Sequence, residues 1–258
     1  MSAAARDAAL ASALLAAAVY VGSGGLAHLD PALLGYLGAT LAAFAAIAYR
    51  ASAFWRRRPS AFYARALAQA LREPARLGRA LVAAGDALVA QRFVARRSRV
   101  RWAAHLLLSL GTLASFAITL PLVFGWLRFV AAGEAPARYR AVVLGVPTPS
   151  FAVDGALAWL AFHALTLSGV AVALGAALLL ALRLGGRAPH ASGSAAFHLA
   201  PLLLLLAVAL SGLALPATRH APRLFDLAAA AHEAAVIALL AALPFSKLHH
   251  VLVRPLQV

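Results

Sequence analysis

Histidines are the side chains of this sequence that are best suited to chemistry. Nine occur in 258 residues, and they divide by position into two groups. Three lie in connecting segments, namely His28, His190 and His220, and six lie in or at the ends of long apolar runs, namely His105, His163, His198, His232, His249 and His250. A single histidine inside a membrane can be a structural hydrogen-bonding group. Ionisable side chains at membrane depth are nevertheless costly and usually functional, so we expect several of the six to act at a site.

The last apolar run, residues 227–251, carries the most informative pair. His232 and His250 are 18 residues apart, which corresponds to about five turns of an α-helix. On one continuous helix the two side chains would share a face, about 27 Å apart along the axis, with one near each membrane surface. Neutral imidazole is a common axial ligand of haem iron. The spacing therefore predicts two stacked b haems.

A haem with two imidazole ligands needs a second histidine from a facing helix at the same depth. Matching the depths pairs His105 with His250 near the cytoplasm, and His163 with His232 near the outside. These four histidines are the predicted axial ligands, and the haem iron is the metal that they would hold.

Two further histidines are alternates. His198 lies a few residues into its apolar run and is either an inner ligand or a polar contact near the interface, such as a contact to a haem propionate. His249 is rotated by about 100° from the face of its neighbour His250, which favours an interfacial role over ligation.

Membrane-spanning helices are the elements that must position these side chains. The chain is 64% hydrophobic and 12% charged, with a mean hydropathy of +0.86. Soluble globular chains are about 45–50% apolar and about 25% charged, so an ordinary soluble enzyme is excluded. The chain has no Cys, which also excludes a disulfide scaffold, a c-type haem protein and a chain that holds iron–sulfur clusters itself.

Six apolar runs reach the length of about 20 residues that a membrane-spanning helix needs. They are residues 8–26, 32–49, 102–124, 156–182, 195–215 and 227–251. The first is expected to remain as a span rather than be removed as a signal peptide, because Asp7 precedes it. We predict an all-α polytopic membrane bundle with three parts: two helices in residues 1–50, a basic amphipathic loop in residues 51–101, and a four-helix haem-binding domain in residues 102–258.

The basic residues predict the orientation and the partners. Thirteen of the 23 basic residues lie between Arg50 and Arg101, where only Glu73 and Asp86 oppose them. Basic residues next to spans mark the cytoplasmic side, so this loop and both termini are predicted to be cytoplasmic, in the inner membrane of a prokaryote. The net charge of +15 then favours anionic lipids or an acidic partner over nucleic acid. Residues 60–71 and 75–94 are predicted to form amphipathic helices that lie on the headgroups, dock a cytoplasmic subunit, or do both.

The C-terminal residues resemble a known family. The sequence HE stands at 232–233, LPFSKLHHV at 243–251 and RP at 254–255. This pattern resembles the gamma subunit of respiratory nitrate reductase, and equally the membrane cytochromes b of heterodisulfide-reductase-like and sulfite-reduction-associated complexes. The resemblance covers residues 100–258. It implies that His232 and His250 are haem b ligands, and that His105 is the first ligand on the opposing helix.

The chain departs from that family at one ligand. The nitrate reductase subunit carries a further ligand on the helix that corresponds to the His105 run, at a position that is close to Ser115 here. Two alternatives follow: His163 replaces that ligand from the next run, or the outer haem is absent.

The resemblance implies a membrane cytochrome b subunit of a respiratory complex, which exchanges electrons between quinone and an iron–sulfur partner through b haems. Because the chain lacks Cys, the clusters would belong to a separate subunit on the cytoplasmic face. Glu233 is either a proton carrier at a quinone site or an acid that favours the helix N-terminus.

Two other functions compete with this hypothesis. One is a membrane anchor or assembly subunit without redox chemistry, which the spacing of His232 and His250 disfavours. The other is a transporter that relays protons through histidines, for which Gly and Pro interruptions within paired spans would be expected.

Overall fold

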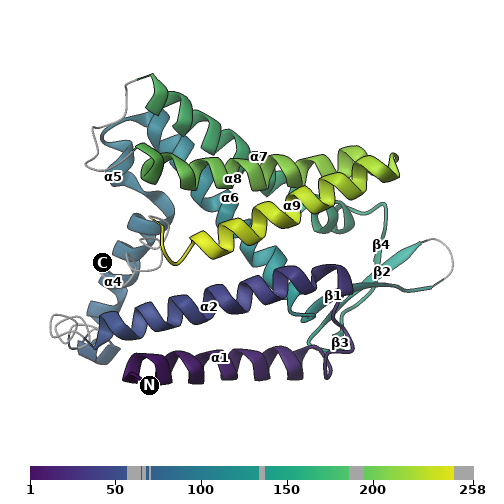
Figure 1. Ribbon diagram of the computed structural model, residues 1–258, viewed down its shortest axis with the longest axis horizontal. Helices are drawn as coiled ribbons and strands as arrows, with labels where there is room; N and C mark the ends of the chain where they lie inside the picture. Colours follow the sequence, from purple (N-terminus) through teal and green to yellow (C-terminus); the bar gives the residue numbers. More distant parts are fainter. Residues whose placement is uncertain (57–64, 66–67, 70, 134–136, 186–194, 247–258) are drawn as a thin grey trace.

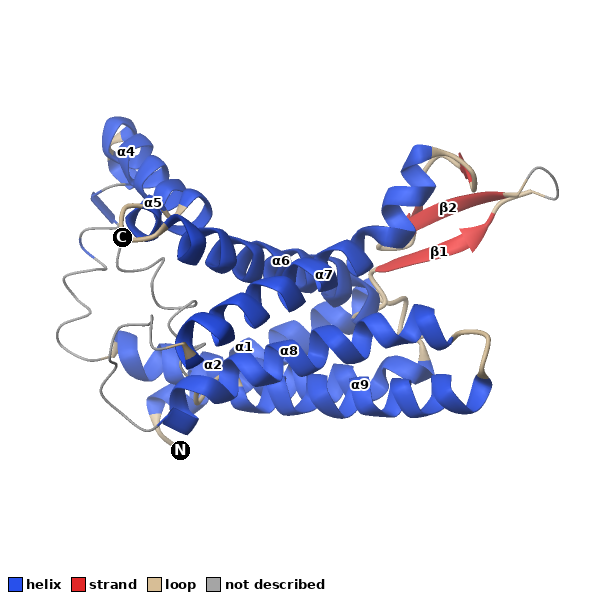
Figure 2. Cartoon of the chain, turned by 90° about the horizontal axis from the view of Figure 1, so that it is seen from above, coloured by secondary structure: helices blue, strands red, loops and turns tan. Residues whose placement is uncertain are grey.

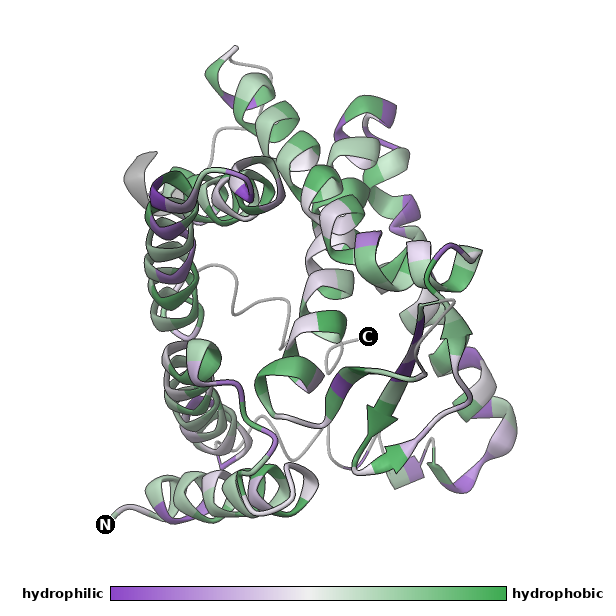
Figure 3. Ribbon diagram, turned by 90° about the vertical axis from the view of Figure 1, so that its right-hand side faces the viewer, coloured by the Kyte–Doolittle hydropathy of each residue, from purple (hydrophilic) through white to green (hydrophobic). Residues whose placement is uncertain are grey.

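The computed structural model describes residues 1–56, 65, 68–69, 71–133, 137–185 and 195–246. Within these residues, six helices are long and apolar enough to cross a membrane, which confirms the predicted all-α polytopic fold. They are α1 (Ala3–Gly22), α2 (Leu34–Trp55), α6 (Arg99–Val123), α7 (Ala156–Leu184), α8 (Ala195–Thr218) and α9 (Pro222–Ala242). Figure 3 shows that these helices are predominantly hydrophobic along their length. Many large apolar side chains on their outer faces are exposed, as expected of helices that face lipid.

The helices pack in sequence order around a common interior. Helix α6 packs along α7, α7 against α8, and α8 against α9, while α2 contacts α9 and α1 lies on α2. One buried cluster, formed by Val172, Leu205, Ala209 and Leu239, joins α7, α8 and α9. A second cluster, formed by Val19, Val123 and Phe124, joins α1 to α6, with side chains of α2 packed against it. The two N-terminal helices and the last four therefore share one bundle.

The two ends of the bundle differ in structure (Figures 1 and 2). One end carries α4 (Pro74–Gly85), η2 (Asp86–Ala90) and α5 (Arg92–Ala95), and we name it the loop end. The other end carries the four short strands between α6 and α7, and we name it the sheet end. The N-terminus lies at the loop end.

Helix α6 starts at a capped position that fixes where its side chains point. The Ser98 hydroxyl accepts a hydrogen bond from the backbone N–H of Arg101 at 3.3 Å, which satisfies one of the free donors of the first turn. Close contact with α7 then sets the rotation of α6. A Cβ added at Gly175 would lie 2.5 Å from the backbone N of Leu108 and 2.7 Å from the carbonyl O of Ala104. Glycine lets the two backbones approach, as small residues commonly do between membrane helices.

The connection between α6 and α7 is a small antiparallel sheet, which the apolar pattern of the sequence does not predict. Its strands are β1 (Leu127–Ala131), β2 (Arg138–Val143), β3 (Val146–Pro147) and β4 (Phe151–Ala152). β1 pairs with β2 from Leu127↔Val143 to Ala131↔Tyr139, and β2 also pairs with β3 and β4. Leu144 and Gly145 have φ of 50° and 84°, the left-handed pair that a tight hairpin turn requires. The rings of Phe129 and Tyr139 each lie 5.3 Å from Phe162, which anchors the sheet to α7.

The basic loop contains the second predicted amphipathic helix, but with an interruption. Helix α4 and the single π-helical turn η2 cover much of residues 75–94, and Gln91 then adopts a left-handed φ of 51° before α5 begins. The first predicted helix, residues 60–71, falls mostly outside the described residues.

Helix α9 ends earlier than the sequence predicts. The expected run to Val251 is wrong in its last part, because the helix stops at Ala242 and a turn follows. Pro244 explains the ending, since proline has no N–H to continue the hydrogen-bond ladder to Leu240. The continuous helix that would place His232 and His250 on one face is therefore not formed. His249 and His250 lie outside the described residues.

Candidate functional site

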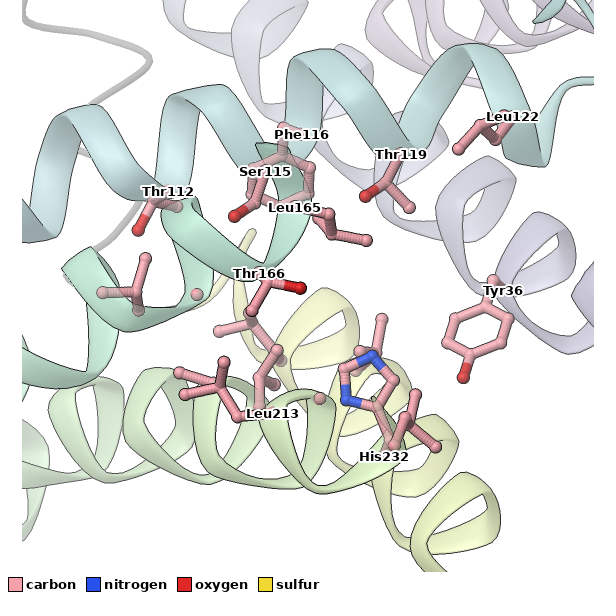
Figure 4. A pocket seen from close by; sticks show the side chains of 18 of the residues that line it. Tyr36, Thr112, Ser115, Phe116, Thr119, Leu122, Leu165, Thr166, Leu213 and His232 are labelled. Carbon is pink, nitrogen blue, oxygen red and sulfur yellow. The ribbon is translucent and has the colours of Figure 1, made fainter. Parts of the chain in front are cut away.

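A cavity of 470 Å³ lies inside the bundle, lined by residues of α6, α7, α8 and α9 with α2 on one side (Figure 4). Its volume falls within the range of roughly 300–1,000 Å³ that is typical of sites for small molecules and cofactors. Most of its lining is apolar, and a few polar side chains converge on it: Tyr36, Thr112, Ser115, Thr119, Thr166 and His232. An apolar chamber with few polar groups is the usual form of a ligand site.

His232 is the imidazole that faces this cavity. Figure 4 shows its ring entering from α9, across from Ser115 and Thr119 of α6. The side chain is half-buried, and its Nδ1 lies 3.1 Å from the hydroxyl of Ser211 on α8. The same hydroxyl lies 2.7 Å from the carbonyl of Ala207, and the His232 ring also bonds the backbone of Val208. With the hydroxyl donating to Ala207, its oxygen would accept from Nδ1–H of the histidine. A proton on Nδ1 leaves the lone pair of the neutral ring on Nε2, the form in which histidine binds a metal.

Two further residues define the space around the His232 ring. A Cβ added at Gly212 of α8 would lie 2.9 Å from His232 Cε1, so this position leaves room for the ring because it is glycine. On the other side, the Tyr36 ring of α2 lies 6.2 Å from the imidazole, with an interplanar angle of 46°. Three helices therefore fix the position of one imidazole.

The wall opposite His232 carries hydroxyl groups. Thr112, Ser115 and Thr119 follow one another at helical spacing on α6 and all line the cavity. Ser115 donates a hydrogen bond to the hydroxyl of Ser168 on α7 at 2.9 Å. The buried hydroxyl of Thr112 has no hydrogen-bond partner among the described residues. This wall of the cavity therefore presents hydroxyl groups to His232.

His163, the predicted outer partner of His232, lies outside the cavity. Its side chain is exposed on α7, its ring stacks on Trp159 at 4.9 Å, and its Nδ1 bonds the carbonyl of Trp159 at 2.8 Å. The physical reason is helix rotation: Phe162 lines the cavity, and the next residue is turned by about 100°. The structure does not bring His163 and His232 together.

His105 lies near the loop end, away from the cavity lining. It stands seven residues before Thr112 on α6, a rise of about 10 Å along the axis. Its Nδ1 lies 2.6 Å from the side-chain oxygen of Gln91, which belongs to the basic loop. Its expected partner His250 lies outside the described residues, as does the side chain of the alternate His198, whose backbone is in the first turn of α8.

Glu233 points toward α2 rather than into the cavity. Its carboxylate contacts the position that a Cβ at Gly35 would occupy, and it is not among the residues that line the cavity. This placement makes Glu233 part of the α2–α9 interface. Within the described residues, no group of three or more His, Asp and Glu side chains is close enough to bind a metal ion directly.

The sequence does not single out four residues that the structure places at these histidines: Tyr36, Gln91, Ser211 and Gly212. A signal exists for the last two, because Ser211 and Gly212 interrupt an otherwise apolar run, and small polar residues in spans often mark helix contacts. Tyr36 and Gln91 belong to the N-terminal helices and the basic loop, whose approach to the site depends on tertiary packing.

Comparisons of the chain with protein-family models, curated proteins and solved structures found no match. A function is therefore inferred from the cavity, from the histidine that faces it and from the distribution of charge.

Proposed function

We propose that this chain is a membrane cytochrome b subunit, which exchanges electrons between a quinone pool and an iron–sulfur partner subunit. One observation carries the proposal: His232 faces an apolar cavity within a membrane bundle, with its Nδ1 3.1 Å from the Ser211 hydroxyl, an arrangement in which Nε2 would be the metal-binding nitrogen. The C-terminal motif that contains His232 supports the same function by resemblance.

The residues around the cavity fit a b haem. His232 would be an axial ligand, Ser211 would orient its ring, and Gly212 leaves the clearance that a larger residue would fill. A bound haem would supply one-electron transfer. The apolar lining would give such a group a hydrophobic surrounding, which is a means by which a protein sets its potential.

A second haem is proposed at the loop end, with His105 and His250 as its ligands. The outer haem at His232 would then have the hydroxyl-bearing wall of α6 on its other side, since His163 is turned away. Quinone is the proposed substrate of the chain.

The orientation and the partners follow from the charge at the loop end. Five arginines lie on α5, in the turn that follows it and at the start of α6, namely Arg92, Arg96, Arg97, Arg99 and Arg101. By the positive-inside rule we place the loop end in the cytoplasm of a prokaryote, where both termini and the partner subunit would also lie. Anionic lipid headgroups would contact the same basic residues.

The proposal is tested by the haem content of the purified protein and of two variants. A pyridine haemochrome assay and a reduced-minus-oxidised spectrum should show b haem in the wild type. His232→Leu should lose the haem that this side chain binds. The matched control, His163→Leu on the exposed face of α7, should keep the wild-type content.

Two results would count against the proposal. A folded wild-type protein without b haem would remove the redox function and favour an anchor or assembly subunit. An unchanged haem content in His232→Leu would remove the cavity as the haem site.

A further inference from the structure

The small sheet at the sheet end has two chemically different faces. Residues that pair directly across two strands share a face, and neighbours along one strand alternate between faces. Phe129, Tyr139 and Phe151 therefore lie on one face, and the rings of Phe129 and Tyr139 pack against Phe162 of α7. The opposite face is turned away from α7 and carries three arginines, namely Arg128, Arg138 and Arg140.

These three arginines lie close together. Arg128 pairs with Val142 and Arg140 pairs with Val130, so the two arginines are diagonal neighbours across β1 and β2, at a separation of about 7–8 Å. Arg138 stands two residues before Arg140 on the same strand, which is a distance of about 7 Å. The positive charges of this face therefore repel one another unless an anion lies between them.

The described part of the chain supplies no such anion. Its ion pairs join residues of α1 and of the basic loop, and none of them lies at the sheet end. Asp154 is the described acid that is closest to the sheet in sequence, and it forms no ion pair with Arg128 or Arg140. The guanidinium of Arg138 donates to the hydroxyl and the carbonyl of Ser150, at 3.0 and 2.7 Å.

Arg140 shows that a partner is needed. Its Nε is buried and has no hydrogen-bond partner among the residues that the structure describes. Leaving a buried donor of a charged group unsatisfied is costly. Arg128, its diagonal neighbour, is exposed, so an anion can approach the pair from outside the protein.

The position of the sheet identifies the anion as the phosphate of a lipid headgroup. Residues 124–126 alone separate the end of α6 from β1, so Arg128 lies just beyond the apolar part of a span. At the same level, the Trp126 ring N–H donates to the carbonyl of Ala18 in α1, and Leu144 is 57% exposed. Tryptophan and exposed apolar side chains, followed outward by arginine, match the order of groups at a membrane surface.

We infer that Arg128 and Arg140 bind the phosphate of an anionic phospholipid in the leaflet at the sheet end, and that Arg138 adds to the positive field of this site. The planar guanidinium group can pair with phosphate through two parallel hydrogen bonds. The inference is independent of the proposed redox function, because it uses neither the cavity nor the histidines. The sheet thus attaches the connection between α6 and α7 to one leaflet, while the basic loop meets the other.

Native mass spectrometry of the full-length protein in neutral detergent measures this binding. Phosphatidylglycerol and phosphatidylcholine would be titrated separately into the wild type and into an Arg128→Gln/Arg140→Gln variant. The wild type should bind phosphatidylglycerol in preference to phosphatidylcholine. The variant should lose one phosphatidylglycerol site, with binding there weakened about 30-fold, or about fivefold for each arginine. Lipid sites at the basic loop are the same in both proteins and cancel in the comparison.

A matched control separates a defined site from general attraction of charge. Arg219→Gln/Arg223→Gln removes two positive charges from the same end of the bundle and leaves the sheet unchanged. This variant should keep the site. Thermal unfolding in neutral detergent verifies that each variant is folded. If the double variant of the sheet does not fold, Arg128→Gln alone carries the test, and it should weaken binding about fivefold.

Three results would overturn the inference. Wild-type affinity for phosphatidylglycerol in the folded sheet variants would leave the arginine face for an acidic protein partner. An equal loss in the matched control would show that no defined site exists. Displacement of the lipid by millimolar inorganic phosphate would assign the site to a soluble anion. A wild-type protein without b haem, by contrast, would overturn the proposed function and leave this lipid site standing.

Discussion

The orientation of His232 depends on two neighbouring residues of another helix. The Ser211 hydroxyl lies 3.1 Å from Nδ1 of the imidazole, and Gly212 leaves the gap into which the ring fits. Substitutions at these positions should change the site without disturbing the rest of the bundle, because neither residue belongs to the buried apolar clusters.

We expect Gly212→Ala to lower the haem content. The added methyl group would lie 2.9 Å from His232 Cε1, so the ring must move away from its position. Haem per chain and the thermal unfolding temperature would be measured together. Gly38→Ala is the matched control, because a Cβ at Gly38 meets nothing within 4 Å. A Gly212→Ala protein with full haem content would show that the ring position is not critical for binding.

The residue scale also shows where sequence reasoning succeeds and where it stops. Membrane depth makes His232 a candidate site residue because the cost of burying an ionisable group is a local property, and the structure places this residue at the cavity. His163 has similar depth and composition around it, yet it faces outward. The difference is the rotation of α7, which is set by packing against α6 at Gly175 and which no count of apolar residues reveals.

At the scale of single elements, the contact between α6 and α7 brings the two backbones close together at Gly175. Gly175→Ala should destabilise the protein by about 1–3 kcal/mol, as overpacking in a tight interior usually does. The reason is that the new Cβ meets backbone atoms of Leu108 and Ala104 that cannot rotate away.

Unfolding in detergent, followed by circular dichroism, would measure the effect of Gly175→Ala. Gly169→Ala on the same helix is the control, since its Cβ would lie 3.5 Å from the Leu213 side chain, an ordinary contact. Equal stability of the two variants would mean that α6 and α7 can separate slightly without cost.

Helix α4 is an exposed amphipathic element that runs across the direction of α1 and α2 in Figure 1. Arg76 and Arg79 lie on one side, and the exposed Leu81 lies on another. We expect this helix to lie on an anionic membrane surface, with each arginine contributing about 1 kcal/mol.

Fluorescence in nanodiscs tests this placement of α4. A polarity-sensitive label on Leu81→Cys should shift to the blue in anionic lipid, and Arg76→Glu with Arg79→Glu should reduce that shift. Arg223→Glu at the sheet end is the control with a similar change of charge. A label that reports the same environment in neutral and anionic lipid would contradict the prediction.

Some of the helices could be predicted from the sequence, whereas one helix end and the sheet could not. The apolar run at 156–182 matches α7, Ala156–Leu184, because lipid requires long continuous helices. The apolar pattern predicts an end of α9 that lies beyond the observed end at Ala242. The reason is that apolar composition continues past Pro244, whereas the helical hydrogen bonds do not. The sheet between α6 and α7 could not be predicted because the pairing of β1 with β2 joins residues that are separated in sequence.

At the scale of the whole molecule, the distribution of charge predicts the orientation of the bundle in the membrane. Because the chain has no Cys, single cysteines can be introduced without background labelling. Val146→Cys lies at the sheet end and Leu71→Cys near the loop end, and the two positions are 68% and 62% exposed.

An impermeant maleimide applied to intact cells should label Val146→Cys but not Leu71→Cys, and inverted vesicles should give the opposite result. The positive-inside rule is the reason for this expectation. Labelling of Leu71→Cys in intact cells would show that the orientation is opposite to the predicted one. The proposed partner subunit would then bind on the other side of the membrane.

Helix α6 links both candidate haem positions in one rigid piece of backbone. His105 is bonded to the basic loop at one point, and two turns later the same helix begins the hydroxyl-bearing wall of the cavity. The helix thus acts as a rigid spacer, and its length and rotation determine the distance and the angle between the two positions. A single residue inserted between His105 and Thr112 would turn one position by about 100° relative to the other and lengthen the path between them by about 1.5 Å. Substitutions in this stretch are therefore easier to accommodate than insertions or deletions.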